Sequence, residues 1–548
     1  MYIAKIDNNN SGDRLVVHNS TSKKMEYRDL SSITLGGNAI YTVAASNTPT
    51  LLKGRADYIC DGTADESEIQ TALGLGDVQL LPGTYNISTT GIQMASNRML
   101  RGSGDSTVLV AVSYTTSTKM ITNTGSTGIT LRDFTIDGAS GSMGYGVYFE
   151  LVGSGTSTTS VMGCLIDNLY IKDAWQSAVE LRSCRYSIIS RCRFDNPHWD
   201  AIVLKKKVGE TKGCIYININ NNISNNSTAF VWLQSAEQIN ITSNNIEGDT
   251  SNGNGQIGIQ IENTSLYVNI VGNVFTNTGE SFVNSNDTCT YINITGNSMI
   301  NTASQAIYLL SPYSIISNNT IEKVGGTAIS LEGDNLLITG NYITEYSQTT
   351  NNTSDGIVYA FGTDAVISNN LLNVGTLTNK GRYGIRVTAG TTNCFITGND
   401  CSNGGTTAAF SVASATALLS DNIDLTGVFK KEAITTSQYK MATARILGRS
   451  TASTGAIEEI SIGSGLSLSA GTLSTTGTGS GITRTIVVTS GSIGAGSTAS
   501  TDYVYLVAGA HTITMPTAVG NTNRYTIKNN DSTNCSSNKS YVRFLFYF

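Results

Sequence analysis

The sequence predicts an all-β protein built as a parallel β-helix, a solenoid in which each turn of the chain stacks on the one before it. A motif of isoleucine, two residues, asparagine, one residue and an apolar residue recurs seven times between Ile241 and Cys401. Its asparagines lie 22 to 29 residues apart, which is too long for a single hairpin and typical of one solenoid turn. With 56 glycines, 5 prolines and 14% charged residues, the composition indicates strands and tight turns.

The repeated asparagines are Asn244, Asn273, Asn297, Asn319, Asn341, Asn370 and Asn399. Asparagine tolerates the left-handed backbone of a sharp corner, and its amide is both a donor and an acceptor, so stacked copies can hydrogen-bond along the solenoid axis. We therefore expect these residues to be buried corner residues that form a ladder. Weaker copies at Asn222 and Asn422, and earlier turns with Phe134, Leu169 or Cys192 at this position, extend the column to roughly 55 Å at about 4.8 Å per turn.

The sequence divides into four regions. Residues 1–50 are too few for a sizeable core and are expected to be an attachment or capping segment. Residues 51–430 form the β-helix, and a short helix at 65–73 with an acidic first turn is expected to cap its open end. Residues 431–484 are rich in Gly, Ser and Thr, which predicts a stem that is ordered only by other copies of the chain. Residues 485–548 form a C-terminal β module.

Charge and cysteine content exclude several classes of function. The net charge of −6 gives no basic surface for nucleic acid or for an anionic membrane. The nine cysteines form no close CxxC pair and only three histidines are present, so we expect buried free thiols, no metal and no cofactor. No apolar run is long enough for membrane insertion, and the N-terminal residues do not resemble a signal peptide, so we expect synthesis without a classical export signal.

Three runs near the start of the predicted β-helix resemble a known family. ADYICDGTADESEIQ from Ala56, LPGTY from Leu81 and LRGSG from Leu100 are similar to the start of pectate-lyase-like right-handed β-helix proteins, above all those that serve as bacteriophage tailspikes. The resemblance implies a homotrimer of the virion tail, synthesised in the host cytoplasm, which binds and often cleaves a bacterial surface polysaccharide. It also implies that the N-terminal segment attaches to other phage tail or baseplate proteins. The clustered calcium-binding aspartates and the catalytic arginine setting of true pectate lyases are not found, so cleavage of pectate is not expected.

Candidate site residues gather on two adjacent turns of the solenoid. Glycoside hydrolysis needs two carboxyl groups roughly 5 to 10 Å apart, one of them protonated, with aromatic faces on which sugars can stack. Glu180 and Asp200 are predicted to lie on adjacent strands, two residues out of phase, with backbones about 8 Å apart, and we expect them to be the catalytic pair. If this pair is not catalytic, we expect Asp195 or Asp173 to take its place. The residues expected to bind the substrate are Trp175, Trp199, His198, Arg182 and Lys205.

Other interpretations remain open for the same residues. Two of these pairs, Asp200 with Lys205 and Glu180 with Arg182, could equally be surface ion pairs, which contribute little to the stability of a protein. A second acidic patch has fewer flanking aromatics and consists of Glu332, Asp334, Glu345 and Asp355.

Three functions follow. The first is a tailspike that depolymerises a host polysaccharide, by hydrolysis rather than by lyase elimination. The second is a noncatalytic receptor-binding spike or adhesin. The third is a secreted bacterial polysaccharide lyase, which the absence of a signal peptide disfavours.

Overall fold

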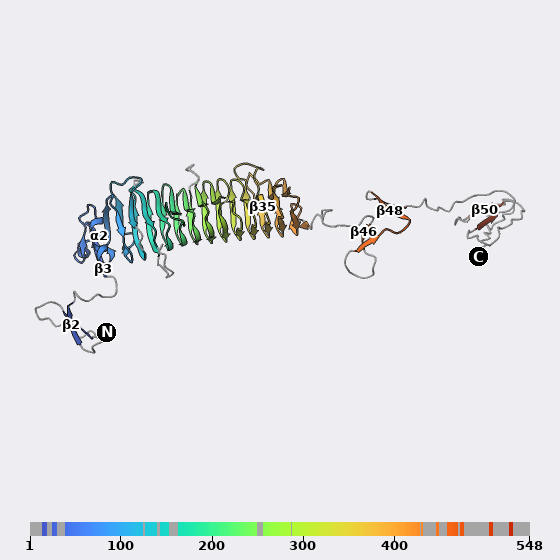
Figure 1. Cartoon of the computed structure of the whole chain (residues 1–548). Helices are drawn as coiled ribbons and strands as arrows, with labels where there is room; N and C mark the ends of the chain where they lie inside the picture. Colours follow the sequence, from blue (N-terminus) through green and yellow to red (C-terminus); the bar gives the residue numbers. More distant parts are fainter. Residues whose placement is uncertain are drawn as a thin grey trace. The chain divides into compact units, whose positions relative to one another are not determined.

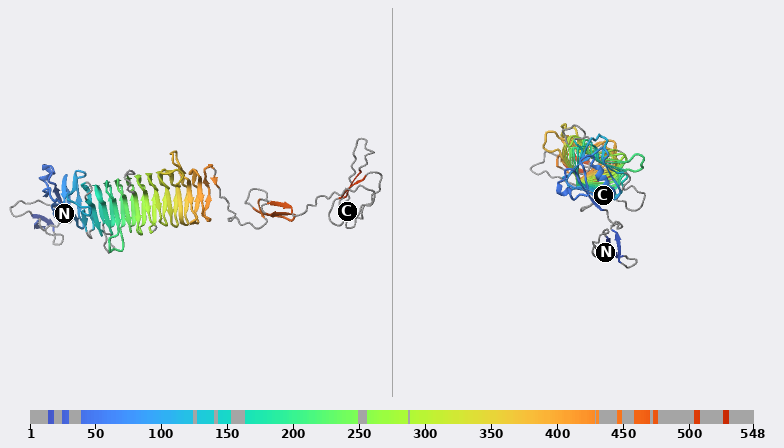
Figure 2. Two further views of the ribbon diagram at one scale, coloured as in Figure 1. Left: turned by 90° about the horizontal axis from the view of Figure 1, so that it is seen from above. Right: turned by 90° about the vertical axis from the view of Figure 1, so that its left-hand side faces the viewer.

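The computed structural model describes residues 39–427, with gaps at 124–126, 140–142, 153–162, 249–255 and 287, together with short strands before and after this stretch. The chain divides into one unit over 1–433 and another over 434–548. The first unit contains the parallel β-helix, whose stacked turns are seen in Figures 1 and 2.

Each regular turn contains three strands, as in β18 (Ile215–Asn220), β19 (Ile223–Asn225) and β20 (Ala229–Gln234). Strands equivalent to these three in successive turns pair in parallel and form what we call the first, second and third sheets. Residues alternate between the core and the outer surface. In β18 the three isoleucines face inward, and they alternate with Tyr216, Asn218 and Asn220.

The other strands of the first sheet are β15 (Arg185–Ser190), β21 (Glu237–Thr242), β24 (Leu266–Val271), β27 (Thr290–Thr295), β30 (Ile315–Ser317), β33 (Leu337–Thr339), β36 (Val366–Ser368), β40 (Phe395–Thr397) and β43 (Leu418–Ser420). The second sheet contains β16 (Arg193–Asp195), β22 (Asn245–Glu247), β25 (Val274–Thr278), β28 (Ser298–Thr302), β31 (Thr320–Val324), β34 (Tyr342–Tyr346), β37 (Leu371–Asn373), β41 (Asp400–Asn403) and β44 (Asn422–Ile423). The long strands β11 (Ile129–Asp137) and β13 (Cys164–Lys172) each contribute to both sheets.

The third sheet follows the order β7 (Ile92–Met94), β10 (Lys119–Asn123), β12 (Met143–Glu150), β14 (Ala174–Arg182), β17 (Asp200–Lys205), β20, β23 (Ile257–Glu262), β26 (Ser281–Ser285), β29 (Ile307–Leu309), β32 (Ile329–Glu332), β35 (Ile357–Thr363), β38 (Tyr383–Val387) and β42 (Ala408–Val412). The short strand β39 (Thr391–Thr392) pairs with β35.

The asparagine ladder is confirmed at the corner between the first and second sheets. Nine asparagines, from Asn222 to Asn422, are at most 2% exposed. At Asn341 the backbone N–H and the Nδ2 group both donate to Oδ1 of Asn370 at 2.9 Å, and Nδ2 also donates to the Ile316 carbonyl at 3.0 Å. The Asn341 Oδ1 atom in turn accepts from Asn319. Each ladder amide thus satisfies backbone groups of a neighbouring turn.

The left-handed backbone of this corner lies one residue earlier than expected. None of the nine ladder asparagines has a positive φ. The residue before each one does, with φ between 54° and 67°: Asn221, Ser243, Gly272, Gly296, Asn318, Gly340, Asn369, Gly398 and Asp421. The prediction that the asparagine itself supplies the left-handed conformation is therefore wrong, and the ladder positions require asparagine for its amide.

The helix α2 (Glu66–Leu75) lies at the N-terminal end of the coil, and its bounds are close to those of the helix expected at 65–73 (Figure 1). Its buried face contains Ile69, Ala72 and Leu73, and it packs against β3 (Ile40–Ala44), β4 (Tyr58–Ile59), β5 (Asp77–Leu80), β6 (Gly83–Ile87) and β7. The other elements here are α1 (Thr50–Lys53), β8 (Met99–Arg101) and β9 (Thr107–Ala111). The parallel pairing of β3 with β5 begins the coil within the segment 1–50. The capping role of α2 stays a prediction.

The remaining strands are β1 (Arg14–His18), β2 (Met25–Asp29), β45 (Phe429–Lys430), β46 (Arg445–Gly448), β47 (Glu458–Ser461), β48 (Leu466–Ser469), β49 (Thr472–Thr475), β50 (Tyr503–Val507) and β51 (Tyr525–Asn529). Most of the expected stem and C-terminal module lies outside the described residues. Eight cysteines fall in the described part, and all are buried and free, as expected. Among the described residues no helix is long and apolar enough to cross a membrane.

Candidate functional site

The third sheet carries both carboxyl groups of the predicted catalytic pair, on the adjacent strands β14 and β17. The strand register pairs Glu180 with Val203 and Asp200 with Ser177, so the two acids are three positions apart along the strands. The expected offset of two is therefore wrong. The physical reason is that Ala201 and Ile202, consecutive residues, are both fully buried in the core, which breaks the simple alternation of inward and outward side chains.

Glu180 is held by two cations. Its side chain is 2% exposed, and its Oε1 atom accepts from Arg182 Nε at 2.5 Å and from Lys205 Nζ at 2.9 Å. Arg182 and Lys205 lie directly opposite each other on β14 and β17. Charge-assisted hydrogen bonds of this kind fix the carboxylate in position. The structure therefore brings together three of the residues that the sequence selected.

The same network extends to neighbouring strands. Glu150 on β12 accepts from Tyr148 Oη at 2.7 Å and forms ion pairs with Lys207 Nζ at 3.1 Å and Arg182 Nη1 at 4.0 Å. Lys119 Nζ lies 3.5 Å from the centroid of the Tyr148 ring. We call Lys119, Tyr148, Glu150, Glu180, Arg182, Lys205 and Lys207 the charged cluster. It has four cations and two carboxylates, which suits an anionic ligand.

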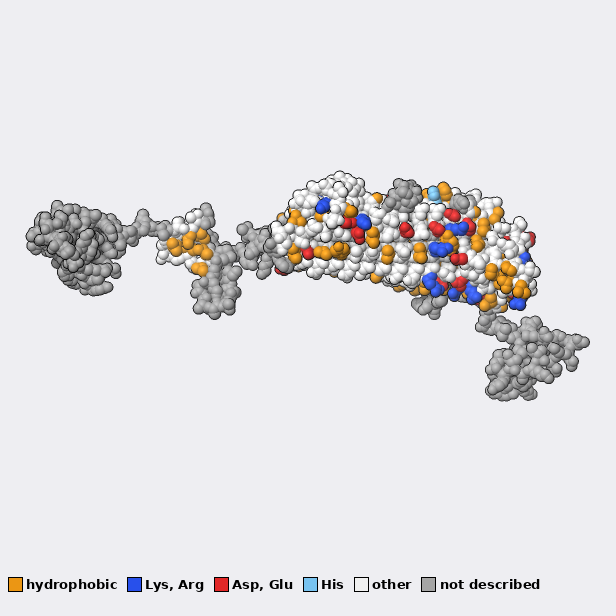
Figure 3. All heavy atoms as spheres, turned by 180° about the vertical axis from the view of Figure 1, so that it is seen from behind, with side chains coloured by type: hydrophobic (Ala, Val, Ile, Leu, Met, Phe, Trp, Pro, Cys, Tyr) orange, Lys and Arg blue, Asp and Glu red, His pale blue; other side chains and the backbone are white. Residues whose placement is uncertain are grey.

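Sequence reasoning did not include Tyr148, Glu150, Lys119 or Lys207 in the site. Lys119 was missed because it lies on the short strand β10, in a part of the chain where no asparagine motif marks the turns. Lys207 was missed because it lies in the loop after β17 and not on a strand. The one signal for Lys207 was its place in the run of three lysines from Lys205. Figure 3 shows acidic and basic side chains gathered on the N-terminal half of the β-helix.

Asp200 is also buried, but none of the ion pairs found among the described residues includes its carboxyl group. Its side chain is 5% exposed, and burial raises the pKa of its carboxyl to about 7. The negative charge of Glu180 raises this pKa further, whereas the Ala229 backbone hydrogen bond and the positive charge of Lys205 oppose the shift. At neutral pH this group therefore exists in both protonated and ionised forms.

The predicted aromatic residues lie beside the start of these strands. Trp175 stacks on His198, with ring centroids 4.0 Å apart and planes 11° apart. Trp199 precedes Asp200 in sequence and is 53% exposed. The indole of Trp199 is thus available to solvent, whereas one face of Trp175 is covered by the imidazole.

The two substitute acids have other partners. Asp195 Oδ2 accepts from Tyr170 Oη at 2.9 Å. Asp173 occupies a left-handed corner with φ of 55°, and its Oδ1 atom accepts from Asn196 Nδ2 at 3.0 Å. Within the described part of the chain, neither carboxylate forms a hydrogen bond or an ion pair with the charged cluster. Asp173 is therefore a corner residue, whereas Asp195 is the last residue of β16.

The second acidic patch is divided between separate interactions. Asp355 accepts a bidentate pair of hydrogen bonds from Arg382, at 3.0 Å to Nε and 2.9 Å to Nη2. Asp334 accepts from the Thr363 backbone N–H at 2.8 Å, and one carboxylate oxygen of Glu345 is buried without a partner among the described residues.

A candidate metal group occurs near α2, where ligand atoms of Cys60, Asp65 and Glu68 lie within 4.8 Å of one another. Burial raises the pKa of the Cys60 thiol and of the Asp65 carboxyl, which favours their protonated forms. Both Asp65 oxygens already accept backbone hydrogen bonds, at 2.8 Å from Gly62 and 2.7 Å from Asn86. This donor set fits a structural turn better than a metal centre.

Comparisons with known proteins agree with this architecture. The family described as "Right handed beta helix region" matches residues 281–424. Tailspike protein 3 of bacteriophage CBA120 is similar in structure, with a TM-score of 0.53 and 13% identity over 69% of this chain and 62% of that one. The tailspike of E. coli bacteriophage HK620, solved with a pentasaccharide, has a TM-score of 0.47 and 11% identity over 74% of this chain and 84% of that one.

The A-module of the mannuronan C-5 epimerase AlgE6 of Azotobacter vinelandii has a TM-score of 0.47 and 14% identity, over 66% of this chain and 95% of that one. No curated protein matches the sequence. The chain is a right-handed parallel β-helix protein, with phage tailspikes and epimerases among its structural neighbours.

Proposed function

We propose that this protein is a tailspike that binds a host cell-surface polysaccharide on the third sheet and depolymerises it by glycoside hydrolysis. The observation that carries the proposal is the contrast between two acids on adjacent strands. Asp200 has a pKa of about 7 because it is buried, whereas Glu180 is held between two cations. A pair of carboxyl groups with environments that separate their protonation states is the arrangement used by glycosidases.

The roles follow from those environments. Asp200 in its protonated form donates its proton to the glycosidic oxygen as the bond to the leaving sugar breaks. Glu180 takes a proton from water as that water attacks the anomeric carbon, and the proton lost by Asp200 is replaced from solvent. Three positions along a strand and one turn across place the two backbones on the order of 11 Å apart. That separation leaves space for the water, as in inverting enzymes.

The charged cluster supports the proposal that the bound glycan is acidic. Its four cations exceed its two carboxylates in a chain whose net charge is −6. An acidic polysaccharide gains more from this surface than a neutral one, and salt should weaken its binding. Trp199 provides an exposed aromatic face on which a sugar ring can stack.

The test is a panel of acidic and neutral bacterial surface glycans incubated with the intact protein. New reducing ends without ultraviolet absorbance from unsaturated products support hydrolysis, and unsaturated products would instead assign lyase elimination. Cleavage that persists in full in both Asp200→Asn and Glu180→Gln overturns the catalytic assignment.

A noncatalytic receptor-binding spike is the second candidate, and the contacts of Glu180 favour it. Arg182 and Lys205 both bind this carboxylate, so its position is explained without chemistry. Under this function the glycan binds and remains intact. If the protein binds one or more glycans of the panel and none of the bound glycans yields a cleavage product, the noncatalytic function is supported.

We also propose that the protein acts as a homotrimer in the virion tail, attached through its N-terminal segment to other tail proteins. A row of apolar side chains on the outer face of the first sheet supports trimer formation. This apolar ridge consists of Ile315, Leu337, Val366, Phe395 and Leu418, which are paired in register on successive strands. A threefold axis parallel to the coil would bring three identical ridges together and remove them from water.

A further inference from the structure

The outer face of the first sheet carries a second row of aromatic side chains, nearer the N-terminal end. Tyr186 stacks on Tyr216 with centroids 5.0 Å apart. Tyr291 stacks on both Tyr267 and Tyr313, with centroids 4.8 Å and 5.1 Å apart. All five tyrosines have left-handed backbones, with φ between 51° and 59° for four of them and 61° for Tyr216. This conformation is unusual for aromatic residues and turns each ring outward from the sheet.

One turn in this row lacks a tyrosine. The register places Gln238 between Tyr216 and Tyr267, with the same left-handed backbone, φ 57°. The outer faces of these two tyrosines are covered by Tyr186 and Tyr291, so their other faces point toward the Gln238 turn. Two turns separate the rings by roughly 10 Å, which leaves the thickness of one ring between them. We call this gap the tyrosine slot.

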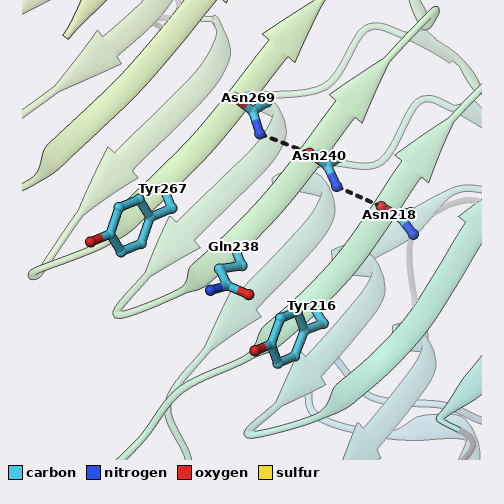
Figure 4. Close-up of a pocket in the computed structure, with 6 residues that line it drawn as sticks. All are labelled: Tyr216, Asn218, Gln238, Asn240, Tyr267 and Asn269. Atoms are coloured by element: carbon cyan, nitrogen blue, oxygen red, sulfur yellow. Dashed lines mark hydrogen bonds between the residues drawn. The ribbon is translucent and has the colours of Figure 1, made fainter.

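The slot is a pocket of about 310 Å³, and Figure 4 shows the six residues that line it. One side of it is a chain of amides in which Asn240 Nδ2 donates to Asn218 Oδ1 at 2.8 Å and Asn269 Nδ2 donates to Asn240 Oδ1 at 2.9 Å. Each amide has two N–H groups and two lone pairs on oxygen, so donors and acceptors remain for a ligand after these bonds are made. The Gln238 side chain has no hydrogen-bond partner among the described residues, which leaves it free to move aside.

We propose that the tyrosine slot binds one uncharged sugar ring of a glycan, at a site separate from the third sheet. Two opposed aromatic faces match the two apolar faces of a pyranose, and a row of amides matches its hydroxyl groups. None of the six lining residues is charged, so the slot selects a neutral sugar, unlike the charged cluster. The proposal does not depend on catalysis at Asp200 and Glu180.

The test uses the full chain with the methyl glycosides of glucose, galactose and N-acetylglucosamine, measured by saturation-transfer NMR with irradiation of the tyrosine ring protons. The expected result is transfer to the ring protons of at least one glycoside, with a Kd of about a millimolar, as for single sugars. Gln238→Tyr fills the gap with a further ring and should abolish transfer. Tyr267→Ala removes one wall and should weaken binding by roughly threefold to tenfold.

Matched variants distinguish a sugar held in the slot from a sugar held elsewhere on the protein. Tyr313→Ala lies in the same row outside the slot and should bind like the parent. Circular dichroism establishes that Gln238→Tyr and Tyr267→Ala fold. The proposal is overturned if no glycoside binds, if Gln238→Tyr binds unchanged, or if adenosine or N-acetyl-tyrosine amide binds better than every sugar, since the slot would then be a general acceptor of aromatic rings.

Discussion

The carboxylate of Glu180 accepts from the ammonium group of Lys205 at 2.9 Å, across the boundary between β14 and β17. Lys205 is directly opposite Arg182, and two cations in this position repel each other unless an anion lies between them. Glu180 supplies that anion because it binds both. A structural role for Glu180 is thus built into the sheet, and any catalytic role has to be measured separately from stability.

Glu180→Gln is expected to lower turnover of a cleaved glycan by at least about a hundredfold, because an amide cannot accept the proton of the attacking water. Initial rates and glycan affinity should be measured together. The control is Glu237→Gln, which breaks the Glu237 to Lys212 ion pair at 2.9 Å on the first sheet and should leave turnover unchanged. Equal rates for Glu180→Gln and the parent would remove Glu180 from the mechanism.

Turnover is expected to fall as the pH rises through about 7, because Asp200 acts in its protonated form and burial raises its pKa to about 7. Asp200→Asn should lose at least about a hundredfold in kcat and should lose this pH dependence as well. The measurement is the pH profile of kcat for the parent and variant. A parent profile that rises with pH across this range contradicts the role of proton donor.

The same shift predicts a pH effect on folding. The pKa of Asp200 is higher in the folded protein than its ordinary value of 3.8, so between about pH 4 and pH 7 the folded state binds the extra proton. The contribution of Asp200 to stability is therefore present below this window and is lost as pH rises through it, by up to about 1.4 kcal/mol per pH unit. Asp200→Asn should unfold at a higher denaturant concentration than the parent at pH 8, and the difference should shrink toward pH 4.

Asn341→Leu is expected to destabilise the β-helix by about 1 to 3 kcal/mol for each buried group that it leaves unpaired. The groups affected include the Asn319 amide and the Ile316 carbonyl. Guanidinium unfolding of the intact chain is the measurement. Asn318→Gly is the matched control, since φ there is 54° and glycine adopts it freely, so this variant should be about as stable as the parent. If Asn341→Leu is as stable as the parent, the ladder does not stabilise the fold.

Trimer formation is expected to depend on the apolar ridge. Replacing Phe395 and Leu337 together with serine should shift the assembly toward monomer at low protein concentration, because the ridge no longer gains from removal from water. Light scattering over a dilution series measures this. Tyr186→Ser, an exposed residue of the same sheet outside the ridge, should not change the mass. A parent chain that is monomeric at every concentration tested would refute the proposed trimer.

The fold could be predicted because every turn repeats the same signal, whereas the site depends on local departures from it. The repeated asparagine motif predicted both the parallel β-helix and the buried ladder at its corner, and the structure contains both. The relation of Asp200 to Glu180 was misjudged because Ala201 and Ile202 both face the core. The left-handed position before each ladder asparagine is occupied by Asn, Ser, Gly or Asp, so it gave no uniform pattern.

The asparagine ladder also determines where the chain can change its length. Successive turns of 22 and 29 residues share the same corner at the ladder. In the two 29-residue turns that the structure describes throughout, the extra residues lie in the loops between the second and third sheets, at 347–356 and 374–382. Insertions and deletions at that edge leave every ladder hydrogen bond in place. The third sheet is therefore bordered by the loops whose length and sequence can vary most freely. The loops beside the proposed glycan site can change in this way without destabilising the β-helix.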